Sequence, residues 1–151
     1  MNWYGWLKVV HVLSAIVWIG GGAALMVVLL RLTQSRDRAT LKAFVPQVSR
    51  YMGSIGGPSS GILLLTGIAM VLVAHMTFKS LWISLGILGV IALGAFGGLV
   101  MAKRVVALEQ AVATGDDTSL AAAGSKVRQG AIIVLSIMAA VVVIMVLKPT
   151  I

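Results

Sequence analysis

The stretch VVHVLSAIVWIGGGAALMVVLL, residues 9–30, decides the fold class of this chain. It holds no Asp, Glu, Lys or Arg, and it is longer than the roughly 20 residues that a helix needs to cross about 30 Å of hydrocarbon. Residues 81–102 and 130–147 also lack charged side chains, and residues 51–76 carry only the titratable His75. Four such segments predict an all-α integral membrane protein, a four-helix bundle with residues 1–151 as a single transmembrane domain.

The composition agrees with that class. Hydrophobic residues make up 60% of the chain and charged residues only 11%, far from the balance of a soluble domain. No basic leader and no small-residue cleavage site accompany the first apolar segment, so we expect no signal peptide. The absence of cysteine excludes disulfides, thiolate metal sites and thiol redox chemistry.

The positive charges are distributed unevenly between the two sides. Nine of the twelve Lys and Arg residues fall in or beside residues 31–50 and 103–128, and only Lys8, Lys79 and Lys148 fall on the other side. This positive-inside bias predicts that both termini are outside, in a multi-pass protein of the bacterial cytoplasmic (inner) membrane. The net charge of +8 then indicates a basic collar at anionic lipid and no nucleic-acid partner.

Capping signals predict how the helices end on the cytoplasmic side. Asp37 is an expected N-cap for the segment that leads into helix 2, and Pro46 and Pro58 are expected to kink or interrupt that helix. Residues 105–113 continue helix 3 past the membrane, with Gly115 as its C-cap and residues 116–118 as the N-cap of helix 4. Helices 3 and 4 should therefore extend into the cytoplasm, while the loop at residues 77–79 makes helices 2 and 3 antiparallel neighbours.

Glycines recur on the helix faces at the spacing that allows close packing in lipid. The recurrences are Gly53, Gly57 and Gly61 on helix 2, and Gly94 and Gly98 on helix 3. They predict backbone contact between helices, and they leave a homo-oligomer through these faces open. On this interpretation Gly98→Leu should wedge helix 3 away from its neighbour.

The two histidines are the candidate site. His11 and His75 both lie toward the outer side of membrane segments, at depths that could place them on either side of a flat macrocycle. Ser14 and Trp18 share a helix face with His11, where Ser14 could orient an imidazole and Trp18 could wall a pocket. The alternatives are a neutral histidine hydrogen-bonded to a neighbouring helix and a tryptophan that only packs.

Other chemistry is disfavoured. The four acidic residues Asp37, Glu109, Asp116 and Asp117 all lie outside the spans, whereas ion-coupled transport commonly needs an intramembrane carboxylate. There is no nucleophile–base pair, zinc motif or phosphate-binding loop.

The chain resembles an uncharacterised family of small bacterial four-helix integral membrane proteins, catalogued as a domain of unknown function. The resemblance rests on residues 7–13, 16–22, 57–61, 65–67, 81–83 and 145–149. More distantly, His11, Trp18, Gly20 and Gly21 make helix 1 similar to HemJ-type protoporphyrinogen oxidases and to copper-resistance D-type membrane domains. The former resemblance implies b-type haem with His11 as ligand. Trp82 lacks the basic residue that soon follows the corresponding tryptophan there, which argues against porphyrinogen oxidation.

Three functions remain in competition. The first is a protein that binds haem b for electron transfer or redox chemistry near the outer membrane face, with His11 as an axial ligand and His75 as its partner. The second is a homo-oligomeric channel or accessory membrane subunit without cofactor. The third is copper handling through His11, His75 and Met70 or Met76.

Overall fold

The computed structural model describes residues 2–35 and 37–149 and consists of four long helices. Three of them contain a π-helical segment. Helix 1 comprises α1 (Trp3–Ala15), η1 (Ile16–Gly21) and α2 (Gly22–Ser35), and helix 2 comprises α3 (Arg38–Tyr51), η2 (Met52–Gly56) and α4 (Gly57–Val73). Helix 3 comprises α5 (Leu81–Ala95), η3 (Phe96–Met101) and α6 (Ala102–Thr114), and helix 4 is α7 (Asp117–Leu147). All four are long and apolar enough to span a membrane, which confirms the all-α fold class.

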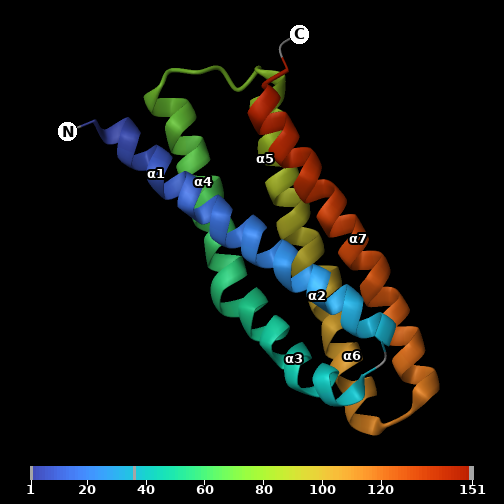
Figure 1. Ribbon diagram of the computed structural model, residues 1–151. Coiled ribbons are helices and arrows are strands. Elements are labelled where there is room, and N and C mark those ends of the chain that lie inside the picture. The colour runs from blue at the N-terminus through green and yellow to red at the C-terminus, as the bar shows by residue number, and fades with distance from the viewer. Residues whose placement is uncertain (1, 36, 150–151) are drawn as a thin grey trace.

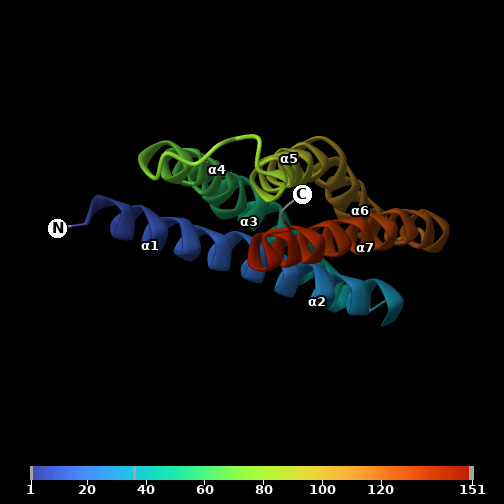
Figure 2. The same ribbon diagram turned by 90° about the horizontal axis from the view of Figure 1, so that it is seen from above.

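The helices form two layers (Figures 1 and 2). Helices 1 and 4 make up one layer, and helices 2 and 3 the other. Helix 1 packs on helix 2 mainly through α1 and α4, and α2 crosses to contact α7. The α5 and α6 segments line up against α7, while α3 meets α6. The bundle therefore closes as a ring in which every helix has two neighbours.

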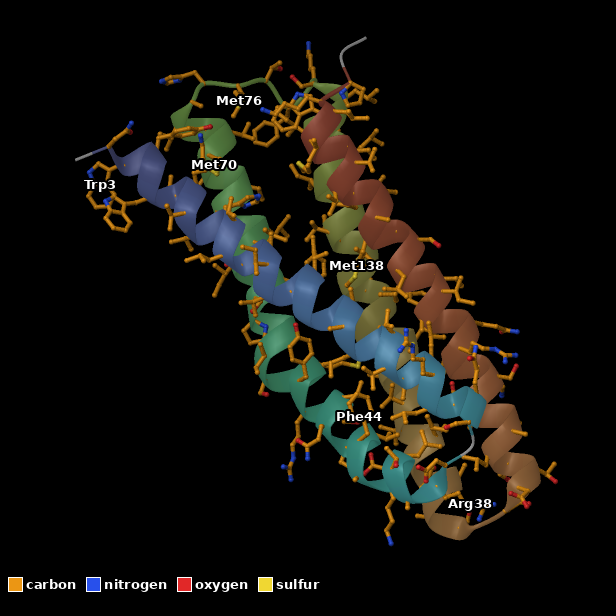
Figure 3. The ribbon with its side chains drawn as sticks, viewed as in Figure 1. Trp3, Arg38, Phe44, Met70, Met76 and Met138 are labelled. Carbon is orange, nitrogen blue, oxygen red and sulfur yellow. The ribbon has the colours of Figure 1, made fainter. Side chains whose placement is uncertain are left out.

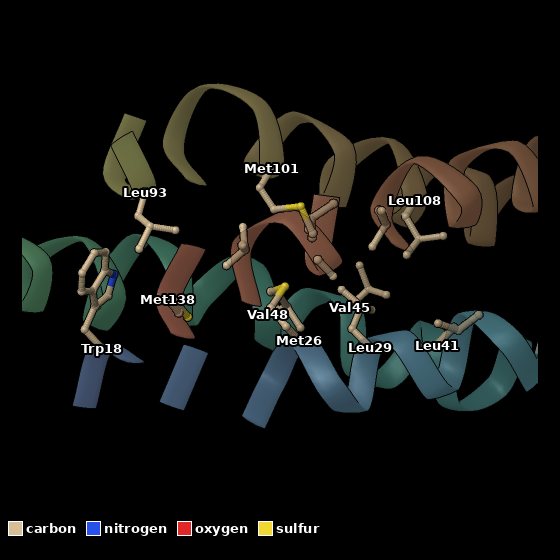
Figure 4. Close-up of a cluster of buried hydrophobic side chains, with 14 of the residues drawn as sticks. Trp18, Met26, Leu29, Leu41, Val45, Val48, Leu93, Met101, Leu108 and Met138 are labelled. Carbon is tan, nitrogen blue, oxygen red and sulfur yellow. The ribbon is translucent and has the colours of Figure 1, made fainter. Parts of the chain in front are cut away.

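The two ends of the bundle differ. The start of α1 and the end of α7 lie at one end, which we call the terminal end, and the connections after α2 and α6 lie at the other, the basic end (Figure 1). The side chains that are buried almost completely come from α2, α3, α6, α7 and η3: Leu29, Leu41, Val45, Val48, Met101, Val105, Leu108 and Val127. Figure 4 shows part of this core. The bundle is therefore packed most tightly toward its basic end.

Polar contacts fix the basic end, and the capping predictions there are confirmed. The Asp37 carboxylate accepts from the backbone N–H and the hydroxyl of Thr40, and Asp116 accepts from two N–H groups at the start of α7. These hydrogen bonds lower the pKa of both carboxyls from their usual value, so each cap is charged at neutral pH and is lost only on acidification below the ordinary carboxyl range. Gly115 caps α6 with φ +77°. Arg38 binds the Gly115 carbonyl and pairs with Asp117 at 2.6 Å, which joins helix 2 to helix 4.

Of the two outcomes expected for the prolines, a kink or an interruption, helix 2 shows no interruption, but it changes direction where α3 meets α4 (Figure 1). Pro46 lies inside α3, and Pro58 stands in the first turn of α4, directly after η2. A proline ring crowds the carbonyls of the preceding turn, and the wider π-helical turn of η2 gives this turn more room. The Ser60 hydroxyl donates to the Gly57 carbonyl at 2.7 Å, so a side chain satisfies one backbone group of this turn.

Helix 2 ends earlier than the sequence predicts. Its last residue is Val73, and the connection to helix 3 covers residues 74–80 instead of only 77–79. The N–H groups of His75 and Met76 bond to the carbonyls of Leu72 and Val71, and His75 has φ +50°. This is a Schellman motif, in which a left-handed residue ends the helix. His75 therefore occupies the position that glycine usually takes.

The glycines that lie against a neighbouring helix are not the ones predicted from the sequence. A Cβ added at Gly53, Gly61, Gly94 or Gly98 would meet nothing within 4 Å. Close approach occurs at other glycines instead: a Cβ would collide with the Met145 side chain at Gly86 and with Val141 at Gly89. The prediction that Gly98→Leu wedges helix 3 from a neighbour is therefore wrong within one chain, because the contact of helix 3 with helix 4 uses another face.

Candidate functional site

His11 is held by helix 2. Its Nδ1 lies 3.0 Å from the Leu63 carbonyl oxygen and 3.1 Å from the Thr66 hydroxyl oxygen, and the imidazole is half-buried between α1 and α4. Gly67 provides the space, since a Cβ there would lie 3.1 Å from the ring carbon Cε1. The imidazole is thus packed against the α4 backbone.

These contacts determine the tautomer of His11. A carbonyl oxygen can only accept, so Nδ1 must carry the proton that it donates to Leu63. The Thr66 hydroxyl donates to the Ile62 carbonyl at 2.7 Å, so its oxygen is also an acceptor toward His11. In the neutral imidazole Nε2 then has a free lone pair. Histidine ligands of metals commonly donate the other ring N–H to a carbonyl in this way.

His75 lies away from this site. It is exposed at the end of helix 2, whereas His11 contacts α4 at residues 63–67. Eight residues separate Gly67 from His75, which is roughly 12 Å at a helical rise. The antiparallel register of α1 and α4 therefore places His75 near the start of α1, and the similar depth expected for the two histidines is not found.

The other residues expected near His11 are distributed along helix 1. Ser14 and Trp18 are both buried, but the imidazole is oriented by Leu63 and Thr66 rather than by Ser14. Met70 lies on α4 and Met76 in the turn after His75 (Figure 3). Within residues 2–35 and 37–149, no group of three His, Asp or Glu side chains could hold a metal ion.

A cavity of about 370 Å³ lies in the middle of the bundle, lined by residues from all four helices and all three π-helical segments. Trp18 and Met26 of helix 1 point toward Leu93 and Met101 of helix 3, and Met138 approaches from helix 4 (Figure 4). Neither His11 nor His75 lines it. A second cavity, of about 350 Å³, lies at the basic end near Gln34 and Arg128.

Sequence reasoning missed the groups that hold His11 and the gathering of methionines. Thr66 and Gly67 belong to residues 65–67, one of the stretches that carry the family resemblance. That resemblance is the one feature of the sequence that could have pointed to them. Met26, Met52, Met101 and Met138 come from four different helices, so no spacing along the chain reveals that they share a cavity.

Comparisons with known proteins give one match. The sequence profile of a family described as "Predicted integral membrane protein (DUF2269)" matches residues 5–149. No curated protein and no solved structure matches the chain.

Proposed function

The chain belongs to the DUF2269 family of predicted integral membrane proteins, and from this premise we propose that it binds b-type haem through His11 for electron transfer or redox chemistry. In the topology that we propose, the protein crosses the bacterial inner membrane four times with both termini outside. His11 then lies near the outer face, two turns inside the start of α1.

One observation carries this proposal: Nδ1 of His11 donates its proton to the Leu63 carbonyl. Nε2 is then the unprotonated ring nitrogen, and its lone pair is available to a metal. A neutral imidazole suits iron and is less costly to bury in a bilayer than a charge. The donor chemistry fits one axial ligand. Because His75 lies about 12 Å further along the helix axis, it is not assigned as the second one.

Helix 2 positions this ligand. The Leu63 carbonyl and the Thr66 hydroxyl oxygen fix the ring plane, and they increase the basicity of Nε2 by accepting from Nδ1. Gly67 admits the ring without a clash. When bound, haem supplies a one-electron couple whose potential depends on the axial ligand, its hydrogen bonds and its burial.

A visible absorption spectrum tests the proposal. Wild-type protein expressed with ample haem and purified gently in detergent should show a Soret band, and a pyridine haemochrome assay should give about one haem per chain. A colourless protein would contradict the proposal. Copper found by elemental analysis of that protein would favour copper handling, and absence of both would favour a cofactor-free membrane module.

The proposed topology has its own test, based on the nine-to-three distribution of Lys and Arg. Cysteines replacing Thr118, in the first turn of α7, and Thr77, in the connection between helices 2 and 3, would lie at opposite ends of the bundle. In intact spheroplasts Thr77→Cys should react with an impermeant maleimide, and Thr118→Cys only after permeabilisation. The wild type has no cysteine and is the blank. The opposite labelling pattern would reverse the orientation.

A further inference from the structure

The cavity at the basic end has a polar mouth above an apolar floor. Its volume of about 350 Å³ falls within the range of about 300–1,000 Å³ typical of small-molecule sites. Three buried leucines from three different helices form the floor: Leu41, Leu108 and Leu120. The mouth holds Gln34 near the end of α2, and Ser125 and Arg128 on α7, all of them exposed or half-buried. The cavity can therefore receive a polar group from outside the bundle.

The polar side chains of the mouth are free to bind a ligand. No hydrogen bond joins the side chain of Gln34, Ser125 or Arg128 to another residue within 2–35 and 37–149. The ion pair at this end of the bundle joins Arg38 to Asp117 and does not involve Arg128. An amide, a hydroxyl and a guanidinium thus offer N–H and O–H donors to the same space.

The charge at the mouth favours an anion. No acidic side chain lines the cavity, and Asp117, at the start of α7, is already paired with Arg38. Arg31 is exposed and lies three residues before Gln34, so it is a neighbour of Gln34 on the same face of α2. Arginine binds phosphate through charge-assisted and often bidentate hydrogen bonds. Arg128, with Arg31 close by, therefore fits a phosphate group.

Apolar side chains continue from the mouth toward the middle of the bundle. On α2, Val27 lies four residues before Arg31 and is 41% exposed, and on α7, Ile132 lies four residues after Arg128 and is 54% exposed. A spacing of four residues places each apolar side chain on the same helix face as its arginine. The two helices pack on each other, so both carry the same order of a charged group followed by an apolar surface. A phospholipid has this order too, in its head group and its acyl chains.

The two arginines also stand at the depth of lipid head groups. Arg31 directly follows the uncharged residues 9–30, and Arg128 stands two positions before the uncharged residues 130–147. Uncharged segments of this length occupy the hydrocarbon of a bilayer, so the residues that border them lie among the phosphates. A lipid can therefore reach the cavity without leaving its leaflet.

We propose that the cavity at the basic end binds the phosphate group of an anionic phospholipid. Gln34, Ser125 and Arg128 donate to the phosphate oxygens, and the acyl chains lie over Val27 and Ile132. A zwitterionic lipid binds less well, because its ammonium group is repelled by the arginines. The site depends neither on haem at His11 nor on which leaflet the basic end faces.

Native mass spectrometry of the delipidated protein in detergent tests the proposal. The wild type should retain about one phosphatidylglycerol per chain, about tenfold more tightly than phosphatidylethanolamine with the same acyl chains. Arg128→Gln should weaken the binding of phosphatidylglycerol about tenfold, the effect of one hydrogen bond to a charged group. Ser125→Leu fills the mouth without altering the charge and should weaken binding about as much. Lys126→Gln is the matched control, since it removes one charge from the same helix outside the cavity, and it should change binding by less than about twofold.

Three results would overturn the assignment. If Lys126→Gln weakens binding as much as Arg128→Gln, the lipid is attracted by the whole basic collar and not by this cavity. If phosphatidylethanolamine is retained as tightly as phosphatidylglycerol, the arginines do not select an anion. Glycerol phosphate, which has the head group without acyl chains, should not displace the lipid even at about a hundredfold excess, because it lacks the apolar contacts. Displacement by an equal concentration would identify a soluble phosphate compound as the occupant.

Discussion

Replacing His11 by alanine is expected to abolish the Soret band of the purified protein. The change removes the imidazole whose Nδ1 is held by Leu63 and Thr66, and no other described histidine lies at this position. Loss of an axial ligand that is both positioned and polarised by Leu63 and Thr66 should reduce the haem content of the protein from about one per chain to background. The haemochrome assay measures this directly.

Two controls separate ligation from folding. Added imidazole should restore the Soret band in His11→Ala, because the free ligand can occupy the vacated space. His75→Gly removes the other imidazole without strain, since glycine is preferred in the left-handed C′ position that His75 occupies. It should retain the band. If His75→Gly loses haem and His11→Ala does not, the assignment of the ligand is wrong.

Replacing Gly89 by leucine is expected to have the largest effect on stability. A Cβ at Gly89 would collide with the γ2 methyl of Val141, a buried side chain that is 5% exposed. Valine is stiff at χ1 in a helix, so it cannot swing aside, and helices 3 and 4 must separate. Overpacking of this kind costs about 3 kcal/mol, which corresponds to a drop in Tm of roughly 10 °C.

Gly98→Leu is the matched control for Gly89→Leu. Both changes add the same side chain to helix 3, but Gly98 faces the open cavity and should leave Tm within about 2 °C of wild type. Thermal unfolding in detergent, followed by circular dichroism, measures both. Similar losses of stability in the two variants would show that the contact between Gly89 and Val141 does not hold helices 3 and 4 together.

The fold could be predicted from the sequence because its determinants are local. About twenty uncharged residues in a row define a span, and Asp37, Gly115 and Asp116 each mark a helix end through bonds to neighbours in the chain. The predicted end of helix 2, at Met76, is three residues too late. No glycine or charge stands there, and a histidine in left-handed conformation terminates the helix instead.

The pairings between helices could not be predicted, because they depend on rotation and register. Glycines spaced four apart indicate a small-residue face but not its partner, so the sequence pattern assigns to Gly94 and Gly98 a contact that Gly86 and Gly89 make. Likewise, the sequence marks His11 as a polar residue in an apolar segment. Its hydrogen-bond partners, Leu63 and Thr66, could not be predicted, because they depend on the register of α1 on α4. The three π-helical segments, each of which contains two glycines, were not predicted from the sequence either.

The order in which the helices pair has a consequence for biogenesis. Helix 1 packs along its immediate successor through α1 and α4, and helix 3 along its own successor through α5, α6 and α7. Each hairpin can therefore close in the bilayer as soon as its second helix leaves the ribosome. The first hairpin would then shield His11 against Leu63 and Thr66 before translation of helix 3 is complete. Docking of the two hairpins through α2 and α7 and through α3 and α6 would then be the last step, so His11 need not face lipid without its partners while helices 3 and 4 are being made.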